Sequence, residues 1–111
     1  MANKTWKNTE RKVAAFLGGE RVPITGRQRG DQPDIRHSIF SLEVKHKKQL
    51  PEWLHDAMRQ AVASLKTDQQ LPVVILHEKG QRHTQDYAVI RLADLRDWFG
   101  LDVNSAVEPV E

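Results

Sequence analysis

The spacing of the apolar residues switches between the helical and the strand period along the chain, and this switching constrains the fold more than any other feature. Three segments have the helical spacing, in which an apolar residue recurs every three to four positions. They are residues 5–17, which end at a Gly-Gly pair, residues 51–67, which begin at a proline, and residues 92–99. Each is therefore predicted to be an amphipathic helix with one apolar face.

Between these helices the apolar residues follow strand patterns. Phe40, Leu42 and Val44 alternate with polar residues, which predicts a strand over residues 39–46 with two different faces. The continuous apolar run at 72–77 predicts a strand covered on both sides. Shorter strands are predicted at residues 21–24, 35–37 and 86–91. The order α-β-β-β-α-β-β-α predicts an α/β fold, a single compact domain in which a mixed central β-sheet is flanked by helices.

The chain has 111 residues, which is the length of one domain. We predict a domain over residues 1–100 and a C-terminal tail at 101–111 that is either flexible or at a dimer contact. The absence of cysteine excludes disulfides, thiolate zinc sites and a cysteine nucleophile. No apolar run has the length of a membrane span and no secretion signal precedes the first helix, so we expect a cytoplasmic protein without a membrane partner.

The charged residues are unevenly distributed. Residues 1–48 hold eleven basic and five acidic residues, a net charge of +6, whereas the remaining 63 residues hold six and ten, a net charge of −4. A basic half is typical of proteins that bind a polyanion such as nucleic acid. The alternative is that the asymmetry arose by chance in a small domain.

Residues 34–45 are predicted to form a hairpin with a tight turn at its centre. In this register Asp34 lies opposite Glu43, and Arg36 lies opposite Ser41. Side chains that oppose each other directly emerge on the same face of the hairpin, with Cβ atoms about 5 Å apart. The predicted register therefore brings two carboxylates together.

These two carboxylates indicate a cation site. Carboxylates this close repel each other unless a cation or a shared proton lies between them, and oxygen ligands favour a hard divalent ion such as Mg²⁺. Because side chains alternate along a strand, Lys45 shares the face of Glu43 and lies within reach of the same site. The alternative is structural, with Asp34 as a turn residue and the other two on a solvated strand face.

Glu10 lies on the apolar stripe of the first predicted helix, between Trp6 and Leu17. A carboxylate on a buried stripe needs a partner. Two interpretations stay open: Glu10 pairs with an arginine at the edge of the core, or it joins the two hairpin carboxylates around an ion.

With these residues in this order, the chain resembles the PD-(D/E)xK nucleases, and within them the branch of archaeal Holliday junction resolvases and small phage endonucleases. The resemblance covers about residues 4–99 and rests on Glu10, Pro33-Asp34, Glu43-Val44-Lys45 and Gln60. It implies a restriction-endonuclease-like fold and a Mg²⁺-dependent DNA endonuclease, with Mn²⁺ as a substitute. It also implies a homodimer that acts on branched or duplex DNA in the cytoplasm of a bacterium or a phage-infected host cell.

The resemblance assigns roles to individual residues. It implies that Glu10, Asp34, Glu43 and the main-chain carbonyl of Val44 hold one or two Mg²⁺ ions, and that Lys45 orients or helps to activate the attacking water. Gln60 is either a supporting active-site residue or the polar edge of its helix. The residues expected to bind nucleic-acid phosphates are Thr25, Arg27, Arg29, Arg36, His46, Lys47 and Lys48.

Two other functions stay open. One is a nuclease of the same fold that nicks or degrades linear or single-stranded DNA, and the other is a non-catalytic DNA-binding module whose carboxylates are structural. The five histidines, at positions 37, 46, 55, 77 and 83, show no zinc spacing, and His77 is interpreted as structural or close to the cleft. Trp53 and Trp98 lie on apolar helical faces and are predicted to pack in the core.

Overall fold

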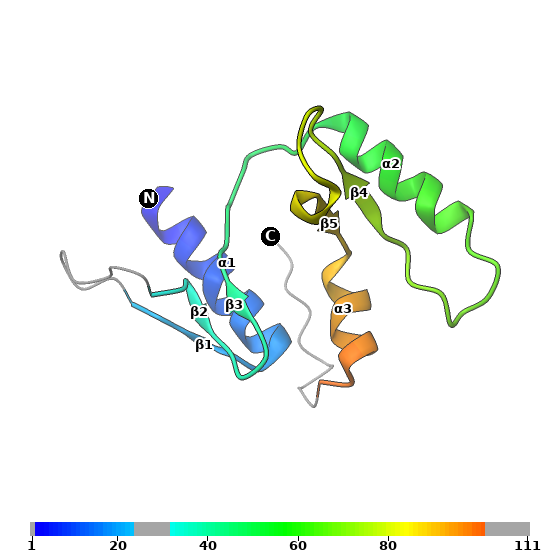
Figure 1. Cartoon of the computed structure of the whole chain (residues 1–111). Helices are drawn as coiled ribbons and strands as arrows, with labels where there is room; N and C mark the ends of the chain where they lie inside the picture. Colours follow the sequence, from blue (N-terminus) through cyan, green and yellow to red (C-terminus); the bar gives the residue numbers. More distant parts are fainter. Residues whose placement is uncertain (1, 24–31, 102–111) are drawn as a thin grey trace. The chain divides into compact units, whose positions relative to one another are not determined.

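The structure is a computed structural model that describes residues 2–23 and 32–101. The described helices are α1 (Ala2–Leu17), α2 (Glu52–Ala63) and α3 (Leu92–Phe99), and a short 3₁₀ helix, η1, spans His83–Gln85 (Figure 1). The described strands are β1 (Glu20–Arg21), β2 (Ile35–Arg36), β3 (Ser41–Leu42), β4 (Val74–Leu76) and β5 (Tyr87–Val89). The α/β class and the predicted order of helices and strands are confirmed, although the strands are shorter than predicted.

The described strands form two antiparallel sheets where one mixed sheet was predicted. The first sheet has the order β1-β2-β3, and the second consists of β4 and β5. Each pair joins strands that follow one another in the chain, which is the pattern of hairpins. A mixed sheet would need a parallel pair across a helix, and the described strands contain no such pair. The restriction-endonuclease-like topology therefore stays a prediction.

The chain divides into two compact units. The N-terminal unit, up to Lys47, contains α1 and the first sheet, and the C-terminal unit, Lys48–Gly100, contains α2, the second sheet and α3. The prediction of one domain over residues 1–100 stays a prediction. Of the predicted tail, residues 102–111 lie outside the described residues.

Two glycines end α1 and allow the sheet to pack closely against it. Gly18 has a φ of +78°, in the left-handed region that ends helices. The N–H of Gly19 donates to the carbonyl of Ala14 at 2.8 Å. A Cβ at Gly19 would lie 2.7 Å from the carbonyl oxygen of Arg36 and 2.8 Å from Cγ2 of Ile35. Since neither neighbour is a flexible side-chain end, β2 can pack this closely only against glycine.

The core of the N-terminal unit lies between α1 and the first sheet. Its buried apolar residues are Ala14, Phe16, Leu17, Val22 and Ile35. Ala14 and Leu17 are three positions apart and share one side of α1, Phe16 is also buried on this helix, and the other two residues come from the sheet side of the unit. This core fixes the helix against the hairpin that carries the predicted site.

His37 ties the end of α1 to the turn between β2 and β3. Its Nε2 donates to the carbonyl of Leu17 at 2.8 Å, and the N–H of Ile39 donates to its Nδ1 at 3.0 Å. A carbonyl only accepts hydrogen bonds, so the ring proton is on Nε2 and Nδ1 is the acceptor. The ring of His37 therefore holds the hairpin turn against the helix end.

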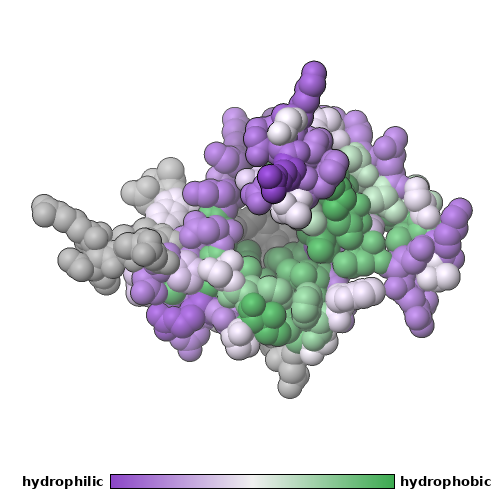
Figure 2. All heavy atoms as spheres, viewed as in Figure 1, coloured by the Kyte–Doolittle hydropathy of each residue, from purple (hydrophilic) through white to green (hydrophobic). Residues whose placement is uncertain are grey.

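The C-terminal unit covers its apolar residues less completely. The helix α2 packs against β4, yet no residue of α2 or α3 is buried, and Figure 2 shows hydrophobic residues (green) at the surface beside hydrophilic ones (purple). Trp53 and Trp98 are 58% and 59% exposed, so the prediction that they pack in the core is wrong. The prediction that the apolar run at 72–77 is covered on both sides is also wrong, because Ile75 is exposed. A two-stranded sheet is too narrow to cover these faces.

None of the described helices is both long and apolar enough to span a lipid bilayer.

We predict that Gly19→Ala lowers the free energy of unfolding by about 1–3 kcal/mol, the usual cost of forcing an extra methyl group into a packed site. The change is measured by urea denaturation followed by circular dichroism. Ala15→Ser is the matched control, because it adds one atom on the exposed face of α1. Equal stability of the two variants would contradict the close packing at Gly19.

Candidate functional site

Asp34 is hydrogen-bonded to two other segments of the N-terminal unit, the one after β1 and the one that contains β3 and its end. Its N–H donates to the carbonyl of Leu42 at 2.9 Å, and its carbonyl accepts the N–H of Val22 at 2.9 Å. Its carboxylate Oδ2 accepts the N–H of Val44 at 2.6 Å. The residue is buried, so these bonds replace the water that an exposed carboxylate would bind. Asp34 is therefore fixed where β1, β2 and the strand end after β3 meet.

The register of the hairpin agrees with the sequence prediction. Ile35 pairs with Leu42, and Arg36 pairs with Ser41 as predicted. One step further along the same register, Asp34 falls opposite Glu43. The pattern of main-chain hydrogen bonds between the two strands changes at this step, because the N–H of Val44 donates to the side chain of Asp34. The local geometry thus connects Asp34 directly to the Glu43-Val44-Lys45 segment.

Glu10 is buried and pairs with an arginine. The Nε of Arg21 donates to its Oε1 at 2.6 Å, and the Arg21 side chain is only 15% exposed. The guanidinium also lies 5.9 Å from the ring centroid of Trp6, which is one turn before Glu10 on α1. The first of the two interpretations of Glu10, pairing with an arginine at the core edge, is confirmed.

The structure does not gather the three predicted carboxylates around one point. In the described residues, the one group of three or more histidine and acidic side chains with ligand atoms within 4.8 Å of one another is a different group. The carboxylates of Glu10, Asp34 and Glu43 do not form such a group. Their role as metal ligands stays a prediction, as does that of the Val44 carbonyl.

The other predicted active-site residues lie at the surface. Lys45 is exposed, and no described residue pairs with its ammonium group. Gln60 is exposed on α2 in the C-terminal unit, where its main-chain carbonyl accepts bonds from Ser64. This surface position agrees with the polar edge of an amphipathic helix.

Four of the predicted nucleic-acid contacts are exposed in the described residues: Arg36, His46, Lys47 and Lys48. Arg36 lies 3.8 Å from the carboxylate of Glu20, and His46 shares a 2.8 Å hydrogen bond with Thr9. Thr25, Arg27 and Arg29 lie outside the described residues.

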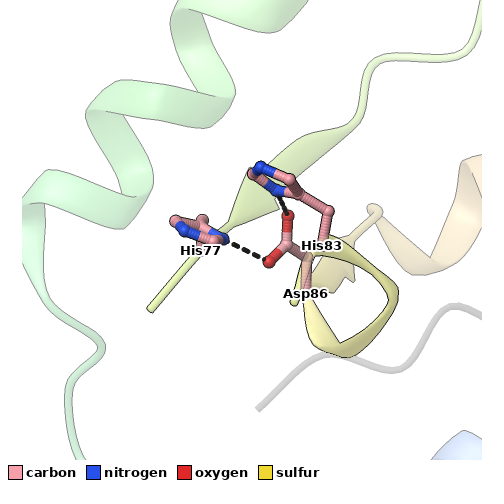
Figure 3. A group of neighbouring side chains, drawn as sticks. All are labelled: His77, His83 and Asp86. Carbon is pink, nitrogen blue, oxygen red and sulfur yellow. Dashed lines mark hydrogen bonds and ion pairs between the residues drawn. The ribbon is translucent and has the colours of Figure 1, made fainter. Parts of the chain in front are cut away.

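A second candidate site lies on the β4–β5 hairpin, within the C-terminal unit. His77, His83 and Asp86 have ligand atoms within 4.8 Å of one another and could hold a metal ion (Figure 3). His77 Nδ1 donates to Asp86 Oδ1 at 2.6 Å, and His83 Nδ1 donates to Oδ2 at 3.1 Å. The two rings stack with centroids 4.3 Å apart. One carboxylate therefore holds two imidazoles.

These bonds keep the Asp86 carboxylate ionised. Two hydrogen bonds lower the pKa of Asp86 below its usual value. The bond from His77 has the larger effect, and the bond from His83 has the smaller one. An ionised carboxylate next to two imidazoles is a ligand set that divalent metals accept.

This group was not predicted from the sequence. The histidines were compared with zinc motifs of close spacing, whereas here His77 and His83 are six positions apart and Asp86 is three further on. The useful signal was the strand pattern on both sides of the polar segment 78–85, because residues at opposite ends of a hairpin connection face each other. His77 is exposed at the end of β4, and its interpretation as structural or close to the cleft stays a prediction.

No family model, no curated protein and no solved structure matches this chain.

We predict that Asp34→Ala and Asp34→Asn differ in stability. Alanine leaves the Val44 N–H without its acceptor, which costs about 1–3 kcal/mol, whereas asparagine keeps an oxygen at the same position. Urea denaturation of both variants measures the difference. Equal losses would mean that the bond to Val44 does not hold the strand end.

Proposed function

We propose that the chain is a Mg²⁺-dependent DNA endonuclease that hydrolyses phosphodiester bonds in branched DNA, as its resemblance to the PD-(D/E)xK nucleases implies. The observation that carries this proposal is the hairpin around Asp34. Its register sets Asp34 opposite Glu43, and the Asp34 carboxylate binds the main chain of the Glu43-Val44-Lys45 segment. The two halves of the family motif are thus joined directly.

The donor chemistry fits Mg²⁺, because carboxylate and carbonyl oxygens are the ligands that this ion prefers. The arrangement fits only in part, since Arg21 holds the Glu10 carboxylate. If one ion is shared by the carboxylates of Glu10, Asp34 and Glu43, the ion has to replace the Arg21 guanidinium as the partner of Glu10. This exchange keeps a positive charge beside a buried carboxylate, so it does not leave Glu10 unpaired.

Phosphodiester hydrolysis needs a deprotonated water and positive charge at the scissile phosphate. A divalent ion, when bound, supplies that charge and lowers the pKa of water. The ammonium of Lys45 is exposed and unpaired among the described residues, so it is available to contact a phosphate and to orient the attacking water. Lysine suits this role better than arginine because its amine can give up a proton in an enzyme site.

The positive charge of residues 1–48 supports DNA as the substrate. Arg36, His46, Lys47 and Lys48 are exposed, and if they bind phosphates the affinity is expected to fall steeply with salt. A homodimer with two-fold symmetry would make paired cuts in a branched substrate.

One observation favours a second function, a non-catalytic DNA-binding module. The Glu10 carboxylate is buried in an ion pair with Arg21, as expected of a structural residue. In this case the carboxylates serve only the fold, and the basic half of the chain still binds DNA.

We predict that the purified chain cleaves DNA with Mg²⁺ and not with EDTA. A panel of four-way junction, flap, duplex and single-stranded substrates, resolved on denaturing gels, measures the preference. The greatest cleavage is expected on the junction. Preference for linear or single-stranded DNA would support the related nuclease activity in place of junction resolution.

Lys45→Ala is expected to reduce cleavage by at least about 100-fold, since a positioned proton-transfer group contributes about 10²- to 10⁴-fold. Folding is expected to be unchanged because Lys45 is exposed. Lys66→Ala, which removes an exposed lysine of the C-terminal unit, is the matched control. Full cleavage by the Lys45 variant would refute the role of this residue.

Calorimetric titration with Mg²⁺ separates the two candidate functions. The nuclease proposal predicts a saturable site that is lost in Asp34→Asn and kept in Glu20→Gln, which alters an exposed carboxylate. The DNA-binding module predicts no such site. Circular dichroism of each variant provides the control for folding.

A further inference from the structure

His77 and Asp86 face each other across the β4–β5 hairpin. Val74 pairs with Val89 and Leu76 with Tyr87, so the next step of this register sets His77 opposite Asp86. The connection between them turns back through η1, which carries His83, and the N–H of Asp86 donates to the carbonyl of His83 at 3.0 Å. Two independent features of the backbone therefore bring three side chains to one place.

Both imidazoles present the same atom to the carboxylate. A carboxylate only accepts hydrogen bonds, so Nδ1 of each ring carries a proton. A tetrahedral metal with ligands at about 2.0–2.2 Å separates its ligand atoms by about 3.3–3.6 Å. The three ligand atoms, one from each residue, lie within 4.8 Å of one another, so they need to move by at most about 1–1.5 Å to reach this separation. The His83 side chain is 84% exposed and has room to make this movement.

We propose that His77, His83 and Asp86 form a binding site for a divalent transition-metal ion of the Zn²⁺ class. The ion takes the place of the two Nδ1 protons, each of which moves to Nε2 of its ring or, where Nε2 already carries a proton, to water; each ring then has one proton, on Nε2. Two imidazoles and a carboxylate select Zn²⁺, Co²⁺ or Ni²⁺ over Mg²⁺, which prefers oxygen ligands.

The bound ion would join the end of β4 to the start of β5 and fix the connection between them. Three protein ligands leave a coordination position open to water or to a small molecule. His77 also lines a pocket of about 430 Å³, together with Leu76, Glu78, Gln81, Gln85 and Tyr87. A small molecule bound at the open coordination position of the ion would therefore lie near the pocket that His77 lines.

The test is calorimetric titration of the untagged full-length chain with Zn²⁺, supported by Co²⁺ absorption spectra. We expect one equivalent of Zn²⁺ and an intense visible Co²⁺ band of tetrahedral type. His83→Ala and Asp86→Asn are expected to weaken Zn²⁺ binding by at least about 10-fold, because even groups that only orient a ligand contribute 10- to 100-fold. His83 is exposed, so its removal is expected to leave the fold intact.

His55→Ala is the matched control, since it removes another exposed histidine of the same unit. Zn²⁺ binding that is lost in His83→Ala and kept in His55→Ala supports the site. Equal binding by both variants, or no binding by the unaltered chain, overturns it. The Asp34→Asn variant separates this result from the proposed nuclease. It is expected to lose the Mg²⁺ site of the nuclease and to bind Zn²⁺ as the unaltered chain does.

Discussion

A buried carboxylate that must be satisfied determines the arrangement of the N-terminal unit. Asp34 bonds through its N–H, its carbonyl and its side chain to Leu42, Val22 and Val44, so a single residue connects three segments. Without these bonds the burial of its charge would be unfavourable by several kcal/mol, on the order of the whole stability of a small domain. The β2–β3 hairpin, the end of β1 and the Glu43-Val44-Lys45 segment therefore depend on the same position.

The second buried carboxylate is satisfied differently. Glu10 relies on one cation, Arg21, which also lies near the face of Trp6. Buried ion pairs add little net stability, because desolvation offsets their attraction, and an apolar pair of the same size is often at least as stable. Stability alone therefore gives little reason for a carboxylate at this position. A cation site that uses Glu10 would provide such a reason. The Glu10–Arg21 pair is therefore compatible with a structural role and also with the proposed nuclease.

The parts of the structure that were predictable from the sequence are those set by local rules. The short turn after β2 fixes the register, so Arg36 opposite Ser41 followed from the sequence. The connection after β4 spans residues 77–86, and a turn this long leaves the register open, so His77 opposite Asp86 did not follow. The exposure of Trp53 was also unpredictable, because periodicity identifies an apolar face but not the width of the sheet that covers it.

The two candidate metal sites differ in chemistry, and this difference limits what each can indicate about function. Around Asp34 the donors are oxygens, which suit a hard ion that retains water and binds phosphates. On the β4–β5 hairpin two of the three donors are imidazoles, which suit ions that bind nitrogen. Zn²⁺ bound at His77 and His83 would therefore be no evidence for Mg²⁺-dependent cleavage. The nuclease proposal depends on the carboxylates of the N-terminal unit and on Lys45 alone.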